Sequence, residues 1–185
     1  MAYTPITLAN SSGLPIVQYR EPEGATQTFV MGAVLKLSSG MLVAGDTANP
    51  WSAADVVYGV AAEPGHNLTT ANTAEPAYSE GSPQNQTSAK IIPVGAWSRD
   101  GKVSLYRADG NNIFLASLKS GQTYAQTLVI AGTYYALVYD SSSKFWYVDN
   151  TDTSGNNNVV EMVGGVSDDT SKCLFRFIST QRYFL

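Results

Sequence analysis

Short apolar runs separated by turn-forming residues fill most of this chain, and they constrain its fold more than any other feature. Between Phe29 and Ile178 each run spans only a few residues and ends at Gly, Asn, Asp or Ser. Runs of this length, bounded by turn formers, are typical of strands at the short spacing found in sandwiches and barrels. The sequence therefore predicts an all-β fold, a single β-sandwich or jelly-roll-like barrel over residues 29–185.

Residues 1–28 differ from this pattern and predict an extended N-terminal arm. Their two short apolar pieces, Ile6–Leu8 and Leu14–Tyr19, are interrupted by Ser, Gly and Pro. Such a segment cannot bury enough surface to stay ordered alone. We expect the arm to pair with a sheet edge, either of its own domain or of a neighbouring chain.

Several segments of the domain carry specific local predictions. Tyr134–Tyr139 and Lys144–Val148 form a hairpin pattern rich in aromatic residues, which suit a half-buried pleated surface. Gly32, inside the predicted strand Phe29–Leu37, indicates a bulge or a close backbone approach. Ile113–Lys119 fits a strand or a short helix equally well. Further strands are predicted at Met41–Ala44, Val56–Ala62, Ala89–Ala96, Lys102–Tyr106, Thr127–Ala131, Val159–Val166 and Cys173–Ser179. No tandem repeat is visible in the sequence.

The long segment Glu63–Ser88 is predicted to be a loop. It is rich in small polar residues, Pro and Gly, and it shows no periodicity. Loops of this length inside a compact domain are uncommon and are usually functional or mobile. It contains the only histidine of the chain, His66, which lies between Gly65 and Asn67 and is interpreted as a turn residue.

Reactive side chains are too few for most catalytic schemes. A nucleophile needs an adjacent base, yet the chain has one His, one Cys and no Gly-x-Ser-x-Gly elbow. Cys173 lies in an apolar run and is predicted to be a buried small hydrophobe. Most Asp and Glu residues lie in turns, where Asp is common for backbone reasons. We therefore assign no catalytic, cofactor-binding or metal-binding residue, expect no cofactor, and expect no enzyme activity.

One loop resembles a calcium-binding loop closely enough to be weighed. Starting at Asn150, oxygen-bearing side chains at Asp152 and Ser154 precede Gly155, and Glu161 occupies the last ligand position. However, the first ligand would be Asn, and the flanking segments read as strands where that motif requires helices. A hydrophilic loop of turn formers without a metal explains the same residues.

Charge and hydropathy exclude two classes of partner. The net charge is −4, charged residues make up 14% of the chain, and Lys and Arg do not cluster. Binding to nucleic acid needs several clustered cations, so we expect none. No apolar stretch approaches the roughly 20 residues of a membrane span, and we expect no membrane association. The first residues lack a basic region and an apolar core, so we expect no signal peptide and synthesis in a cytoplasm.

A family resemblance is carried by residues in the front half of the domain. The stretches are Phe29-Val-Met-Gly-Ala-Val-Leu-Lys-Leu37, Gly40-Met-Leu-Val43, Asp55-Val-Val-Tyr-Gly-Val-Ala-Ala62 and Pro93-Val-Gly-Ala-Trp97. They resemble the decoration, or cement, proteins of tailed-bacteriophage heads, in which Val-x-Gly-x-x-Val-x-Leu and Gly-x-Leu precede Ile/Val-x-Gly-Val-Ala. The resemblance covers about a third of the chain, and its motifs are structural.

This resemblance implies a non-enzymatic virion protein on the outer surface of an icosahedral capsid. Such a protein would be made in the host cytoplasm, form a homotrimer, and bridge neighbouring subunits of the major capsid protein. The alternative is a receptor- or glycan-binding module of a head or tail fibre. Exposed, coplanar aromatic rings in one cleft would favour that alternative, whereas burial of Trp97 and Trp146 would favour cement.

Overall fold

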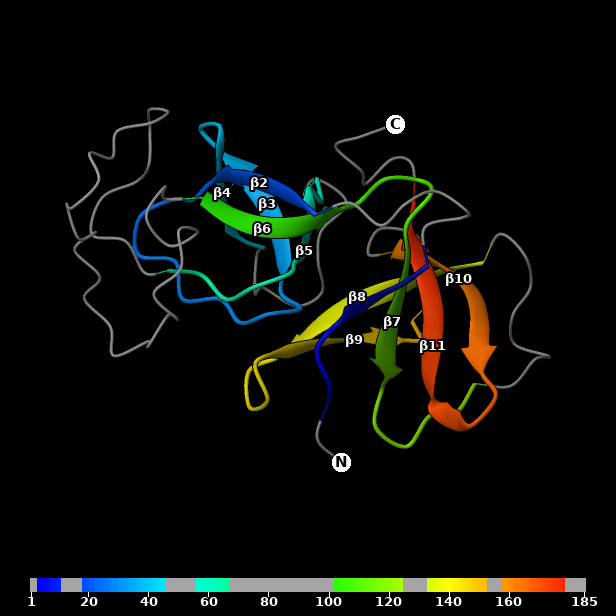
Figure 1. Ribbon diagram of the computed structural model, residues 1–185. Helices are drawn as coiled ribbons and strands as arrows, with labels where there is room; N and C mark the ends of the chain where they lie inside the picture. The colour runs from blue at the N-terminus through cyan, green and yellow to red at the C-terminus, as the bar shows by residue number, and fades with distance from the viewer. Residues whose placement is uncertain are drawn as a thin grey trace.

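The structure is a computed structural model, and it describes six stretches of the chain. These stretches are residues 3–10, 18–45, 56–66, 102–124, 133–152 and 158–178. Within them the chain forms eleven strands and no helix. Figure 1 shows the strands gathered into two sheets that lie next to each other. The predicted all-β class is confirmed.

The first sheet holds five strands in the order β2-β6-β5-β3-β4. They are β2 (Tyr19–Pro22), β3 (Val34–Ser38), β4 (Met41–Ala44), β5 (Gly59–Ala61) and β6 (Lys102–Arg107). The two outer strands meet through a parallel bridge between Glu23 and Leu42, where the Gly24 N–H donates to the Leu42 carbonyl at 2.8 Å. This contact closes the sheet into a small barrel, which we call the first barrel.

The second sheet closes in the same way and carries one extra strand. Its strands are β1 (Thr7–Asn10), β7 (Ile113–Leu118), β8 (Tyr134–Asp140), β9 (Phe145–Asp149), β10 (Asn158–Val166) and β11 (Asp169–Phe177), in the order β1-β7-β11-β10-β8-β9. Parallel pairing of β7 with β9 closes the ring of strands β7 to β11, and the Lys119 N–H donates to the Val148 carbonyl at 2.9 Å. Strands β7 to β11 form the second barrel.

The two barrels share one topology. We number the five strands of each barrel in chain order, β2 to β6 in the first barrel and β7 to β11 in the second. In each barrel the first strand pairs with the fifth, the fifth with the fourth, the fourth with the second and the second with the third, all antiparallel. A short parallel contact between the third and first strands completes each ring. The chain is therefore a structural tandem repeat, although no repeat is visible in its sequence.

Because the strands pair in the same order, each residue of one barrel has a counterpart, the residue at the same place in the other barrel. A single assignment of counterparts agrees with the pairing register of every strand pair in both barrels. The counterparts, first barrel before second, are Tyr19 and Phe114, Glu23 and Leu118, Leu37 and Leu137, Leu42 and Val148, Gly59 and Val160, and Leu105 and Phe175. Gly24 and Lys119, which donate the closing hydrogen bonds, are counterparts too. Each residue can thus be compared with the one that occupies the same place in the other barrel.

Each barrel has a hydrophobic interior, and the two barrels share a boundary. Leu35, Leu42, Val103 and Leu105 are buried within the first barrel. The larger cluster fills the second barrel and also includes Val34, Val57 and Val60 from the first. Because side chains alternate along a strand, Val34 and Val60 point away from the first barrel's interior and toward the second. The two sheets are packed together, which is consistent with the predicted β-sandwich; the jelly-roll detail is not confirmed.

The described parts of the N-terminal arm are built into these sheets. β1 pairs with β7, β2 pairs with β6, and Ile6 is 1% exposed. Gly32, with φ of +82°, lies under this segment: a Cβ there would come within 2.7 Å of the Ile6 nitrogen. The sequence predicted that the arm pairs either with a sheet edge of its own domain or with one of a neighbouring chain. The described residues pair with edges of their own domain. The close approach predicted at Gly32 is confirmed.

Most other strand predictions on described residues are confirmed, with two corrections. Of the predicted strand Val56–Ala62, only Gly59–Ala61 is a strand. Ile113–Leu118 is a strand rather than a helix, and the aromatic hairpin forms β8 and β9. The predicted strand Phe29–Leu37 is wrong in its first half, because a turn containing Gly32 occupies residues 31–32 and β3 begins at Val34. The predictions for Ala89–Ala96, Thr127–Ala131 and most of the Glu63–Ser88 loop lie outside the described residues.

Candidate functional sites

The only histidine is part of a buried hydrogen-bonded pair, which corrects its interpretation as a turn residue. His66 is 2% exposed and Glu23 is fully buried. The Glu23 carboxylate accepts the His66 backbone N–H at 2.7 Å through Oε1 and contacts Nδ1 at 2.6 Å through Oε2. This pair fixes residues 65 and 66 to the closing contact of the first barrel. Burial of both side chains keeps a solvent-borne substrate away from the imidazole.

Comparison between the barrels shows how unusual this pair is. The counterpart of Glu23 is Leu118, a buried apolar residue of the second barrel. A carboxylate at such a position is stable only when its oxygens are hydrogen-bonded. Gly65 makes the arrangement possible, because a Cβ there would lie 2.8 Å from the Gln27 carbonyl oxygen and 3.2 Å from Glu23 Oε1.

A second polar group lies on the first barrel around Glu21. The Tyr58 hydroxyl donates to Glu21 Oε1 at 2.9 Å, and the Arg107 guanidinium donates to the same oxygen at 3.1 Å. Arg107 also lies 3.6 Å from the centre of the Tyr19 ring. Burial, followed by the hydrogen bond to Glu21, raises the pKa of Tyr58 to about 12. The tyrosine is therefore a hydrogen-bond donor at neutral pH rather than a base.

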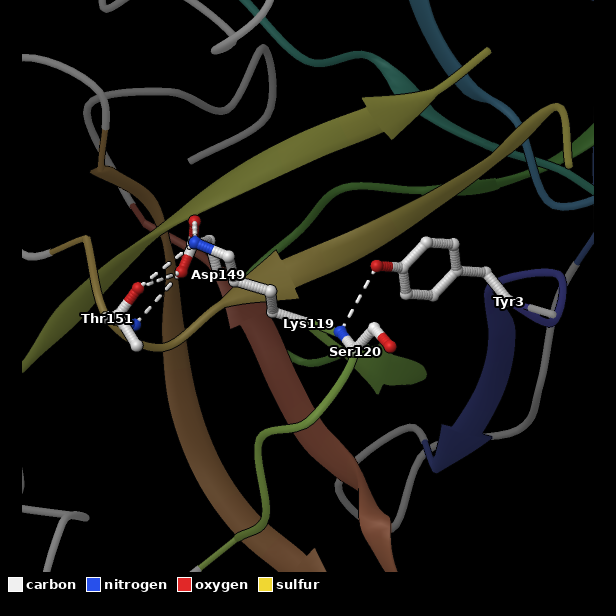
Figure 2. Close-up of polar contacts among 5 residues, drawn as sticks. All are labelled: Tyr3, Lys119, Ser120, Asp149 and Thr151. Atoms are coloured by element: carbon white, nitrogen blue, oxygen red, sulfur yellow. Dashed lines mark hydrogen bonds and ion pairs between the residues drawn. The ribbon is translucent and has the colours of Figure 1, made fainter. Parts of the chain in front are cut away.

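Figure 2 shows Lys119 and Ser120, two neighbouring residues that follow β7. Lys119 contacts β9 and Ser120 contacts the N-terminal segment, so the two residues link these parts of the chain. The Ser120 N–H donates to the Tyr3 hydroxyl at 3.1 Å, and the Tyr3 ring stacks on Tyr147 at 4.3 Å between centroids. The Lys119 ammonium lies 2.9 Å from Asp149 Oδ2. These contacts involve three parts of the chain distant in sequence, so they are structural ties of the second barrel.

Asp149 is the centre of that network. Burial opposes its ionisation, but hydrogen bonds from Thr151 and Lys119 outweigh burial and hold the pKa of the carboxyl below its ordinary value. The Thr151 hydroxyl donates to Asp149 Oδ1 at 2.6 Å, and Lys119 Nζ lies 3.3 Å from Thr151 Oγ1. The carboxylate is charged at neutral pH and already bound by its own chain.

The remaining residues singled out from the sequence show no catalytic or metal-binding arrangement where they are described. Cys173 is buried, and burial raises the pKa of its thiol to about 12, so the thiol is an inert part of the core at neutral pH. Glu161, the last residue of the calcium-like loop, hydrogen-bonds Arg176 Nε at 2.8 Å on the surface of β10. Residues 153–157 of that loop lie outside the described chain. Within the described stretches, no three His, Cys, Asp or Glu side chains converge as a metal site.

A cleft of about 310 Å³ lies where the two barrels meet. One wall comes from residues 26–30 and the end of β4, and the other from Tyr139, Lys144 and Trp146 of the second barrel. Its size is at the lower end for small-molecule sites, which are common at such boundaries. Thr26 and Lys144, which line it, have φ of 56° and 65°, a conformation uncommon outside glycine.

The aromatic rings in this cleft do not form a sugar-stacking platform. Trp146 is 1% exposed, so its ring face is not available to a ligand. Tyr139 meets it at an interplanar angle of 56°, with centroids 5.3 Å apart, so the two rings are tilted rather than coplanar. Trp51 and Trp97 lie outside the described residues.

The outer face of the second barrel carries a group of partly exposed side chains on four strands, which we call the outer patch. Its residues are Leu115, Tyr134, Glu161, Val163, Leu174 and Arg176. Tyr134 and Val163 are each 43% exposed. Nothing in the sequence indicates this patch, because strand pairing alone brings its members together.

Comparisons with known proteins returned no relative. No family model matches the chain, no curated protein is similar to it, and no solved structure has a similar fold at a significant level. In the described stretches no helix is long and apolar enough to cross a bilayer.

Proposed function

We propose that this protein is a non-enzymatic decoration protein that binds the outer surface of an icosahedral phage capsid. It bridges neighbouring subunits of the major capsid protein and stabilises the shell. The observation that carries the proposal is where the family-like residues lie. Three of the four stretches, between Phe29 and Ala62, provide β3, β4 and β5, which are contiguous in the first barrel.

Glycine positions within those stretches support this assignment. Gly59 lies beneath Leu105 and Tyr106, and a Cβ at that position would come within 2.4 Å of both residues. Gly32 makes room for the crossing N-terminal segment in the same way. The motif residues therefore have a shared structural purpose, as expected for a family defined by its scaffold rather than by catalytic chemistry.

The chemistry of the described residues also supports a binding role. The buried His66 and Cys173 are inaccessible, and the charged pairs such as Lys119 with Asp149 are satisfied within the chain. Of the two tryptophans that distinguish the candidates, Trp146 is buried, which favours the cement assignment over the glycan-binding alternative with its exposed coplanar rings; Trp97 lies outside the described residues. A protein of this kind acts through repeated surface contacts whose avidity exceeds each single affinity.

The direct test uses empty, expanded capsids of the phage that encodes the protein, stripped of this chain. Purified protein should co-sediment with the capsids and saturate them at a fixed number of copies per shell. It should also raise the temperature at which the shells fail, because a ligand that binds only the assembled shell stabilises it by RT ln(1 + [L]/Kd) per site. Absence of co-sedimentation, or an unchanged failure temperature at saturation, would contradict the proposal.

A further inference from the structure

The tandem repeat allows the outer faces of the two barrels to be compared residue by residue. In the first barrel, Val34, Val60 and Tyr106 lie side by side on β3, β5 and β6, since Val34 pairs with Val60 and Val60 with Tyr106. All three pack against the large cluster of the second barrel. Inside this chain, that outer face therefore serves to dock one barrel on another.

The same three places in the second barrel hold Tyr134, Glu161 and Arg176. Glu161 pairs with Tyr134 on β8 and with Arg176 on β11, as Val60 pairs with Val34 and Tyr106. No described segment buries this face: the Tyr134 side chain is 43% exposed, and the Arg176 side chain is 45% exposed. Within the described stretches, the second barrel thus leaves uncovered the face that its counterpart buries.

Two members of the outer patch, Tyr134 and Arg176, are of residue types that are common at contact surfaces. Tyr and Arg, together with Trp, are enriched at the energetic centres of protein interfaces. Around the central Glu161–Arg176 pair lie Tyr134 and Val163, and Leu174 pairs with Leu115 next to them. The two charges neutralise each other at 2.8 Å, so the patch has no bias toward a strongly charged partner.

We propose that the outer patch is a self-association surface, and that its occupant is a second copy of this chain. The within-chain interface provides the precedent, because there the equivalent face docks against a barrel of the same topology. Because Glu161 and Arg176 neutralise each other, the patch does not repel a second copy of this chain. A contact between different faces of two copies is heterologous, and such contacts close into rings when the rotation allows. This inference extends the proposed function by naming the surface that joins decoration subunits to one another.

The test is sedimentation equilibrium on the full chain and three variants over a range of concentrations. Tyr134→Ala and Val163→Arg change two exposed positions of the patch. Met31→Ala is the matched control, because Met31 is 47% exposed and lies in the turn before β3, outside the six residues of the patch. We expect Tyr134→Ala to weaken self-association at least ~30-fold, as loss of a central interface residue does. Val163→Arg should also dissociate the oligomer, and Met31→Ala should leave it unchanged. Circular dichroism checks that all variants keep the strand content of the parent.

The outcomes separate this inference from the proposed function. A parent chain that stays monomeric at high micromolar concentration, or an oligomer unaffected by both patch variants, overturns the self-association surface. Patch variants that keep their oligomeric state but lose capsid binding also overturn it, because the patch would then contact the shell. Failure of the parent chain to bind capsids would reject the decoration function, whatever its oligomeric state.

Discussion

Replacing Glu23 by Leu is the sharpest test of how the first barrel is held together. The second barrel already holds Leu118 at the equivalent place, so a leucine has a precedent there in size and burial. In the first barrel, however, the substitution removes both oxygens that bind His66. Breaking a buried pair by removing one partner costs about 3–5 kcal/mol, because the other partner stays buried without compensation.

The magnitude translates into a readily measured change in melting temperature. For a chain of 185 residues, each kcal/mol lowers the Tm by about 2–4 °C, so Glu23→Leu should lower it by about 6–20 °C. His66→Leu should cost a similar amount. The double variant should recover much of the lost stability. A destabilisation of about 1–3 kcal/mol should remain, because the backbone N–H at position 66 no longer has an acceptor.

The assay is urea unfolding of the parent, the two single variants and the double variant, analysed as a double-mutant cycle. A coupling free energy above about 2 kcal/mol between the two positions is expected. Single losses below about 1 kcal/mol, or losses that simply add in the double variant, would refute the view that this buried pair is a coupled structural unit.

Three further predictions follow from single contacts. Gly165→Ala should lower the free energy of unfolding in urea by about 1–3 kcal/mol, because the added Cβ would overlap the Tyr124 ring. Gly164→Ala is the control and should cost far less, since the nearest atom to its Cβ would be 3.9 Å away. Equal costs for the two variants would contradict this prediction. The Cys173 thiol, whose pKa is raised to about 12 by burial, should resist alkylation at pH 8 in the folded chain and react once urea unfolds it; rapid reaction of the folded chain would contradict burial. The Tyr58 pKa is raised from 10.0 to about 12, so between these pH values the unfolded chain binds fewer protons than the folded chain and stability should fall as pH rises. Tyr58→Phe should make that fall shallower, and an identical slope would show that Tyr58 does not contribute.

Local features of this fold are visible in the sequence because they depend on a few neighbouring residues. The turn between β3 and β4 is one case. It lies between the predicted strands that end at Leu37 and begin at Met41, and its Ser39 and Gly40 adopt φ of 52° and 80°, which a two-residue hairpin requires. The aromatic hairpin of β8 and β9 and the close approach at Gly32 are others. In each, residue type limits the backbone directly, so the prediction needs no knowledge of distant contacts.

The repeat and the buried polar pair escaped prediction because both depend on residues far apart in the chain. Counterparts such as Glu23 and Leu118, or Val60 and Glu161, differ in chemistry, so the two barrels share topology without a shared sequence pattern. His66 lies next to glycine, as turn residues do, and only Glu23, 43 positions earlier, makes its burial possible. The outer patch is likewise assembled by strand pairing.

The pairing of β1 with β7 has a consequence for how the chain folds during synthesis. Thr4 and Ser117, which are hydrogen-bonded in the folded protein, lie 113 residues apart. At about 5–20 residues per second, β1 is made roughly 5–25 s before its partner strand. All strands of the first barrel are made within that interval, while β1 still lacks β7. An unpaired strand can pair with another nascent chain, and distant pairings form slowly. Residues 3–10 are therefore made before every strand they contact, and their partner strand β7 follows only after the whole first barrel has been made.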